Sequence, residues 1–192
     1  MADLKTRVVN ILTKPRTEWP LISVEKTDAT TLTAGYIAIL AAIPPVATYI
    51  GLAVVGIGTF TGMRYRIDPV RGLVSAVLQY LLAVAGVHVA ALIVDRLAPT
   101  FKSQPSAIQA LKLVAYASTA LWVAGAVNII PTLSEVAFLA GLYSIYLFYL
   151  GVGPVMKTPD DQVLPYMVVS AVVVIVVTLA AVALAAALAS AV

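Results

Sequence analysis

The residues that could do chemistry in this sequence are polar side chains set inside long apolar stretches. His88 and Asp95 are seven residues apart, which on a helix places them on one face and two turns apart. Polar groups in an apolar helix are costly unless they face water or a partner, and an imidazole titrates near physiological pH. The pair is therefore a candidate site for a proton, an ion or a small solute.

A second polar stripe follows in the next apolar stretch. Lys112, Tyr116 and Thr119 repeat at i, i+4 and i+7, so they also share one helix face. With two tyrosines from the stretch after that, the pattern predicts a polar cluster of seven residues: His88, Asp95, Lys112, Tyr116, Thr119, Tyr146 and Tyr149. The alternative is a structural role, in which Asp95 is interfacial, Lys112 reaches toward the interface and the other groups only hydrogen-bond between helices.

Other reaction chemistry finds little support in the sequence. The chain has no cysteine and one histidine, which excludes disulfides, thiolate catalysis and Cys/His metal clusters. It has no phosphate-binding glycine loop, no H-E-x-x-H and no nucleophile elbow. The adjacent carboxylates Asp160 and Asp161 follow a proline and are typical of a solvated turn at a helix start. We therefore predict no enzyme activity, no cofactor and no metal ion.

The elements that must position these residues follow from the composition. The 192 residues are 61% hydrophobic and 11% charged, with a mean hydropathy of +1.01. Soluble domains carry about 25% charged residues, so the solvent of this chain is a bilayer, and a net charge of +3 indicates no nucleic-acid surface. Five stretches without a charged residue exceed the length of about 20 residues that a span needs: 29–63, 72–94, 113–134, 136–156 and 162–192.

These stretches predict an all-α integral membrane protein with five transmembrane helices. A cytoplasmic segment over residues 1–30 precedes a single five-helix transmembrane domain over residues 31–192. The first stretch is too short for two spans and a turn, so it holds one span, in which Pro44–Pro45 predicts a kink. The expected spans cover about 32–57, 72–94, 109–130, 135–156 and 163–190.

The distribution of cations predicts the orientation of these spans. With five spans, the side that holds Arg64, Arg66 and Arg71 carries no other cation. By the positive-inside rule, the N-terminus is cytoplasmic and the C-terminus lies outside, as expected for a protein of the cytoplasmic (inner) membrane. The cations on the side of the N-terminus are Lys5, Arg7, Lys14, Arg16, Lys26, Arg96, Lys102, Lys112 and Lys157.

The N-terminal segment carries an amphipathic pattern. Its apolar stripe has helical spacing and consists of Leu4, Val8, Ile11 and Leu12. We expect a short helix on the cytoplasmic leaflet that ends at Pro15 and turns its cations toward anionic headgroups. An ordinary polar tail with accidental spacing is the alternative. The predicted lipid-binding residues are Lys5, Arg7, Lys14 and Arg16, with Trp19 at headgroup depth.

Several ordered motifs resemble one family. They are Asp95–Phe101 (DRLAPTF), Gln109–Tyr116 (QALKLVAY), Gly141–Tyr149, Met156–Asp161 (MKTPDD) and the KPRTEWP segment at residues 14–20. Together they resemble the prokaryotic branch of the Yip family, five-span membrane proteins named for eukaryotic relatives that interact with Ypt/Rab GTPases. The resemblance implies the same topology, with a cytoplasmic N-terminus.

Two functions remain open from the sequence. The first is a non-catalytic membrane-organising or partner-recruiting scaffold of the Yip type. Its partners would be membrane lipids, an unidentified protein and further copies of the chain in a homo-oligomer. The second is a small channel or transporter that moves an ion or small solute through the polar cluster in the cytoplasmic half of the bundle. A transporter usually shows internal repeats and paired broken helices, and this sequence shows neither clearly.

Overall fold

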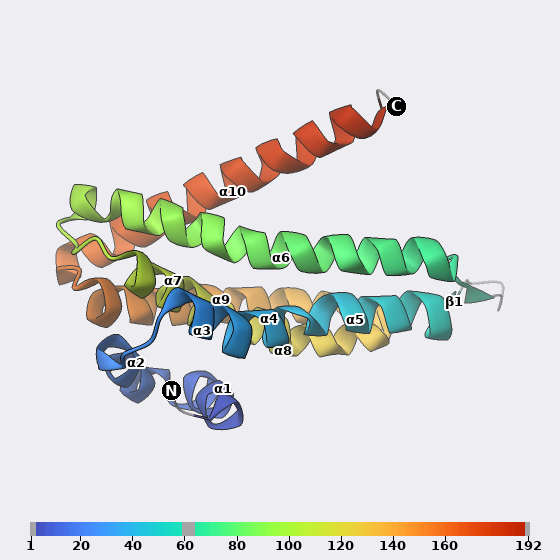
Figure 1. Cartoon of the computed structure of the whole chain (residues 1–192). Coiled ribbons are helices and arrows are strands. Elements are labelled where there is room, and N and C mark those ends of the chain that lie inside the picture. The colour runs from blue at the N-terminus through green and yellow to red at the C-terminus, as the bar shows by residue number, and fades with distance from the viewer. Residues whose placement is uncertain (1–2, 59–63, 191–192) are drawn as a thin grey trace.

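A short helical hairpin lies beside a bundle of long helices (Figure 1) in this computed structural model, which describes residues 3–58 and 64–190. The hairpin consists of α1 (Leu4–Thr13) and α2 (Pro15–Val24). The bundle follows in the order α3 (Ala29–Leu32), η1 (Thr33–Ile37), α4 (Ala38–Ala41), α5 (Ile43–Ile50), η2 (Gly51–Val55), β1 (Ile57–Gly58), β2 (Arg64–Tyr65), α6 (Pro69–Leu97), η3 (Ala98–Phe101), α7 (Ala107–Ala117), α8 (Thr119–Ala124), η4 (Gly125–Ile129), η5 (Pro131–Leu133), α9 (Ser134–Met156) and α10 (Asp160–Ser190).

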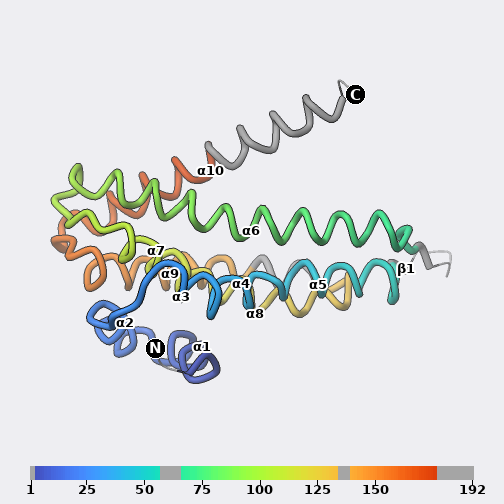
Figure 2. The backbone as a smooth tube through the Cα atoms, viewed as in Figure 1, coloured from blue at the N-terminus to red at the C-terminus, as the bar shows by residue number. Residues whose placement is uncertain are grey.

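The hairpin has clear local signals for its two helices. Asp3 caps α1, because its carboxylate accepts a hydrogen bond from the Thr6 amide at 3.4 Å. Pro15 ends α1 and occupies the first position of α2, where its missing N–H costs nothing. In Figures 1 and 2, α1 is seen nearly end-on while the long helices run across the view, so the axis of α1 crosses the direction of the spans.

The first span runs over Ala29–Val55 and is built from several helical pieces. It begins at Asp28, whose carboxylate accepts from the Thr31 amide at 2.8 Å. The α-helix is interrupted at Ala42, because Pro44 and Pro45 have no N–H to donate to the turn before them. The structure therefore has the break that the double proline predicts.

The second span is a single long helix, α6. Asp68 caps it by accepting from the Arg71 amide at 2.9 Å, and Lys102, with a positive φ of 54°, ends the η3 turn that follows. Its 29 residues extend over about 43 Å, whereas the hydrocarbon core is about 30 Å thick. The helix is therefore long enough to cross the hydrocarbon and reach the headgroup region. A two-residue antiparallel pair, β1 with β2, precedes it.

The third span is also interrupted, and it packs closely against the first. Ser118 separates α7 from α8, and η4 continues the span. A Cβ at Gly125 would lie 2.5 Å from Cγ of Pro44, and one at Gly51 would lie 2.2 Å from the Asn128 carbonyl oxygen. The absence of a side chain at both glycines lets α5 and η4 approach.

Four helices of the described chain are long and apolar enough to cross a membrane: Ala29–Val55, Pro69–Phe101, Ala107–Ile129 and Leu139–Met156. They confirm the first four predicted spans, with the second longer than expected. The fifth prediction falls on α10, one continuous helix over Asp160–Ser190. A crossing by α10, and with it the count of five, stays a prediction.

Candidate functional site

A buried group of charges joins the hairpin to the bundle; we call its members, Arg7, Glu18, Glu25 and Lys112, the docking cluster. Arg7 lies on α1 and is only 4% exposed. One end of its guanidinium group donates to Glu18 on α2, and the other donates to Glu25 at the end of α2. Two carboxylates from one helix thus bracket one guanidinium from the other, which closes the hairpin.

Lys112 connects this closed hairpin to the third span. Its side chain is buried, and its Nζ donates to the carbonyl oxygens of Ile22, at 3.0 Å, and Glu25, at 2.5 Å. The last carbonyls of a helix have no partner within it, and a cation at this end also interacts favourably with the helix dipole. Lys112 therefore caps α2 from a different helix, and the cluster is formally neutral.

Tyr116 is the aromatic centre of the same region. The Arg7 guanidinium lies 5.5 Å from the centre of its ring, within the range of a cation–π interaction. Trp19 and Tyr36 contact it edge-on, with ring centroids 6.4 and 4.6 Å away. The Tyr36 hydroxyl is 2.7 Å from Oγ1 of Thr119. The hairpin, the first span and the third span therefore meet at Tyr116.

The fourth span completes the packing around the hairpin. A Cβ at Gly151 on α9 would lie 2.7 Å from the Trp19 ring, and Trp19 is fully buried. Further along α9, the Tyr143 hydroxyl donates to the Leu12 carbonyl oxygen at 2.7 Å. Because the third and the fourth spans both contact it, the hairpin is an integrated part of the fold.

Three of the seven residues of the predicted polar cluster come together here. Lys112, Tyr116 and Thr119 share the face that their spacing predicts, and they contact the hairpin and the first span. Tyr146 and Tyr149 are 40% and 44% exposed on α9. They do not join the other three.

His88 lies elsewhere on the exposed surface of α6. Its Nε2 is 3.0 Å from Oγ1 of Thr33, and its Nδ1 is 2.9 Å from the Val84 carbonyl oxygen. Because a carbonyl only accepts, Nδ1 carries the ring proton when the imidazole is neutral, and Thr33 then donates to Nε2. Both ring nitrogens of His88 are therefore engaged within the protein.

Asp95 is separate from both groups. It is half-buried on α6, and its Oδ1 has no hydrogen-bond partner among the described residues. The neighbouring Val94 carbonyl accepts from the Tyr166 hydroxyl of α10 at 2.5 Å. Within the described chain, Asp95 forms no ion pair with Lys112, and no group of three metal-binding side chains is present. The seven predicted residues thus form no common site.

The predicted lipid-binding residues divide into two sets. Lys5, Lys14 and Arg16 are exposed, whereas Arg7 and Trp19 are buried in the protein. The apolar stripe of α1 also faces the bundle: Ile11 is fully buried, and Leu4, Val8 and Leu12 pack against the core. This corrects the expectation that the stripe faces lipid, because helical spacing shows that a helix is amphipathic but not which apolar surface it covers.

The sequence alone did not indicate that Glu18 and Glu25 pair with Arg7. For Lys112 there was a signal, because a lone lysine near the start of an apolar stretch needs a partner. Periodicity could not identify that partner, because the Glu25 carbonyl oxygen that Lys112 binds is 87 residues away in sequence.

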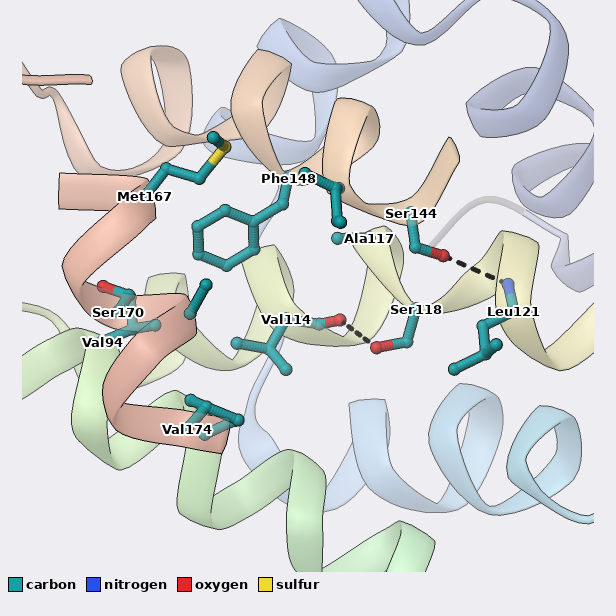
Figure 3. A pocket seen from close by; sticks show the side chains of 13 residues that line it. Val94, Val114, Ala117, Ser118, Leu121, Ser144, Phe148, Met167, Ser170 and Val174 are labelled. Carbon is teal, nitrogen blue, oxygen red and sulfur yellow. Dashed lines mark hydrogen bonds between the residues drawn. The ribbon is translucent and has the colours of Figure 1, made fainter. Parts of the chain in front are cut away.

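A cavity of about 210 Å³ lies between α6, α7, α9 and α10 (Figure 3). None of the 13 described residues that line it is titratable. Two serines bond to the protein at its wall: Ser118 donates to the Val114 carbonyl oxygen at 2.8 Å, and Ser144 accepts from the Leu121 amide at 3.2 Å. Ser170, also on the wall, has a buried hydroxyl with no hydrogen-bond partner among the described residues. This lining suits hydrocarbon better than an ion.

Comparison with known proteins places the chain in a family. Residues 9–182 match the family model of the Yip1 domain. The chain is 25% identical over 164 residues to the protein named "Inner membrane protein YohC" of Escherichia coli strain K12, with 84% of each chain covered, and to its counterpart in E. coli O6:H1. No solved structure matches significantly. The match begins within α1 and extends over α2 and the long helices, and the chain belongs to the Yip1 family of membrane proteins.

Proposed function

We propose that this protein is a non-catalytic scaffold that organises the membrane and recruits partners at its cytoplasmic face. The observation that carries the proposal is the docking cluster. Its buried charges close a helical hairpin outside the spans and fix it against the third span, and Tyr143 of the fourth span donates to the same hairpin. A hairpin fixed in this way is a preorganised surface, and preorganisation lowers the ordering cost of binding.

The proposed location is the cytoplasmic membrane, with the N-terminus inside. The name of the E. coli relatives supports the location. For the orientation, the hairpin, the α6–α7 connection and the α9–α10 connection, which together carry most of the cations, lie at the same end of the bundle (Figure 1). Lys112 binds the end of α2, and the Gln104 amide donates to the Met156 carbonyl oxygen at 2.9 Å. These contacts bring the hairpin and the connections that carry Lys102 and Lys157 together.

A small channel or transporter is the second candidate. It is favoured by the interruptions at Ala42 in the first span and Ser118 in the third, since transporters build binding sites from broken helices. His88, Asp95 and Lys112 do not come together in one site, which counts against a transport function. So does the absence of a titratable group among the described residues that line the cavity.

Reconstitution into proteoliposomes separates the two candidates. We expect proton and alkali-cation flux equal to that of empty vesicles, measured with internal fluorescent indicators. A pH-dependent flux that is lost in a well-folded His88→Ala variant would establish the transporter and overturn the scaffold.

The recruiting role is tested by photocrosslinking in cells. A photoreactive residue at Lys26, exposed at the end of the hairpin, should give a discrete protein adduct. The same residue at Leu78, exposed on α6 within a span, is the control and should give none. Equal adducts from both positions, or none from Lys26, would contradict recruitment by the hairpin.

A further inference from the structure

The fold separates the charges of the hairpin between its interior and its surface. Residues 3–26 contain five cations and three carboxylates. Glu18 is buried against Arg7, and the side chain of Glu25, paired to the same guanidinium, is only 17% exposed. The surface keeps four exposed cations and one exposed carboxylate: Lys5, Lys14, Arg16, Lys26 and Asp3. The pairing thus withdraws two carboxylates and one cation from the surface. The net charge of residues 3–26 is +2, and the net charge of their exposed side chains is +3.

Large apolar side chains accompany these cations. Val9 on α1 is 49% exposed, and Leu21 and Val24 on α2 are 58% and 77% exposed. None of the three belongs to the stripe by which α1 packs on the bundle. Cations interleaved with protruding apolar residues are the pattern by which a helix lies in a membrane interface.

The position of the hairpin suits such an interface. Its α1 helix crosses the direction of the spans beside the bundle (Figure 1). The α6 helix, on the other side of the bundle (Figure 1), is about 13 Å longer than the hydrocarbon core is thick, so its ends can reach the headgroup region. The hairpin lies beside the end that we propose to be cytoplasmic.

From this arrangement we propose that the outer surface of the hairpin binds the anionic phospholipids of the adjacent leaflet. Lys5, Lys14 and Arg16 contact the phosphates, and Val9, Leu21 and Val24 enter the acyl boundary. The docking cluster positions this surface, because it withdraws Glu18 and Glu25 from it. The inference rests on the proposed scaffold function and assigns the lipid partner of its hairpin.

Charge complementarity favours lipid as the occupant. Exposed cations at a bilayer surface are attracted to anionic headgroups within a Debye length, about 10 Å at 0.1 M salt. The hairpin is already held at that surface by the spans, so it pays no translational cost to reach it. The exposed apolar side chains add a second contact, which neutral lipid also provides.

The test uses the full chain, which lacks cysteine. A cysteine at Val9 carries an environment-sensitive fluorophore, and the protein is reconstituted in phosphatidylcholine with or without an equal share of phosphatidylglycerol. A spin label on the lipid headgroup reports contact by quenching. We expect stronger quenching in the anionic vesicles than in the neutral ones. This extra quenching should fall at high salt. A fluorophore at Val24 gives an independent reading.

A matched pair of variants assigns the effect to the hairpin. The double variant Lys5→Gln/Lys14→Gln should reduce the extra quenching in anionic vesicles by about half or more, because two of the three cations that contact phosphates are lost. Lys102→Gln/Lys157→Gln removes two exposed cations elsewhere at the same end and should leave it unchanged.

Two results would overturn the inference: equal quenching in both vesicle types, or equal losses in both double variants. Because the quenching does not report flux or protein adducts, failure of the lipid contact is distinguishable from failure of the scaffold function.

Discussion

At the scale of single residues, Arg7 is the side chain that allows its two carboxylate neighbours to be buried together. Its guanidinium holds Glu18 and Glu25 together and rests on the Tyr116 ring. Without it, two carboxylates would face each other in a site that excludes water. The i, i+4, i+7 spacing could predict that Lys112, Tyr116 and Thr119 share a face. It could not predict Arg7 as their neighbour, because that contact depends on tertiary docking.

Replacing Arg7 by Met should therefore destabilise the protein by about 3–5 kcal/mol, the usual cost of leaving a buried charge without its partner. The control is Lys5→Met, on the exposed side of the same helix, which should stay within about 0.5 kcal/mol. Unfolding of both variants in mixed micelles measures the difference. Equal stability of the two would contradict the buried ion pairs.

Lys112→Met should cost less, about 1.5–3 kcal/mol, because the acceptors that lose their charged donor are neutral backbone carbonyls. Fast hydrogen exchange in the last turn of α2 should accompany the loss, since that turn loses its cap. Lys157→Met removes an exposed cation and serves as the control. An unchanged exchange rate in α2 for Lys112→Met would show that the cap is not needed.

At the scale of elements, local signals predicted where helices begin and break better than what they cover. Pro15 and Pro44–Pro45 each mark an observed boundary, because a proline acts on the turn next to it. The amphipathic period of α1 was correct as a helix signal. The apolar stripe of α1 covers protein and not lipid. This contact depends on where the fold places α8 and α9.

The cap at the start of the first span should make its stability depend on pH. Hydrogen bonds from the Thr31 amide and hydroxyl, both 2.8 Å, lower the pKa of Asp28 below its ordinary value of 3.8. The folded state thus favours the ionised form, so the contribution is complete above pH 3.8 and is lost as the pH falls through the lower folded value. Asp28→Asn retains a cap without a titrating group.

Thermal unfolding at neutral pH and near pH 3 tests the cap. The wild type should lose more stability on acidification than Asp28→Asn does. An identical loss in both proteins would mean that the Asp28 carboxylate contributes nothing to the pH dependence.

At the scale of the whole molecule, four helices long and apolar enough to cross a membrane and a docked hairpin define the architecture of the described chain. Composition and charge-free length predicted those four helices, because the thickness of the bilayer fixes how many apolar residues a helix needs. The same reasoning could not locate the polar residues relative to each other. His88 bonds to Thr33 and Lys112 to the end of α2, whereas Oδ1 of Asp95 has no hydrogen-bond partner among the described residues. The rotation of each helix depends on its packing.

Cysteine accessibility in intact cells tests the orientation. A cysteine at Lys102 should resist an impermeant thiol reagent added outside, and a cysteine at Arg66, on the other side of α6, should be labelled. The reverse pattern would invert the topology. A cysteine at Val192, which lies outside the described residues, should also be labelled if α10 makes the fifth crossing; protection there would leave four.

The bond between Lys112 and the Ile22 carbonyl joins residues 90 positions apart, and this separation has a consequence for synthesis. At about 5–20 residues per second, roughly 5–20 seconds pass between the emergence of α2 from the ribosome and the arrival of its cap. During that interval Arg7 lacks the setting that buries it, and all five cations of the N-terminal segment are available to the insertion machinery. The nascent chain is then oriented by five cations, one more than the four that the finished fold exposes.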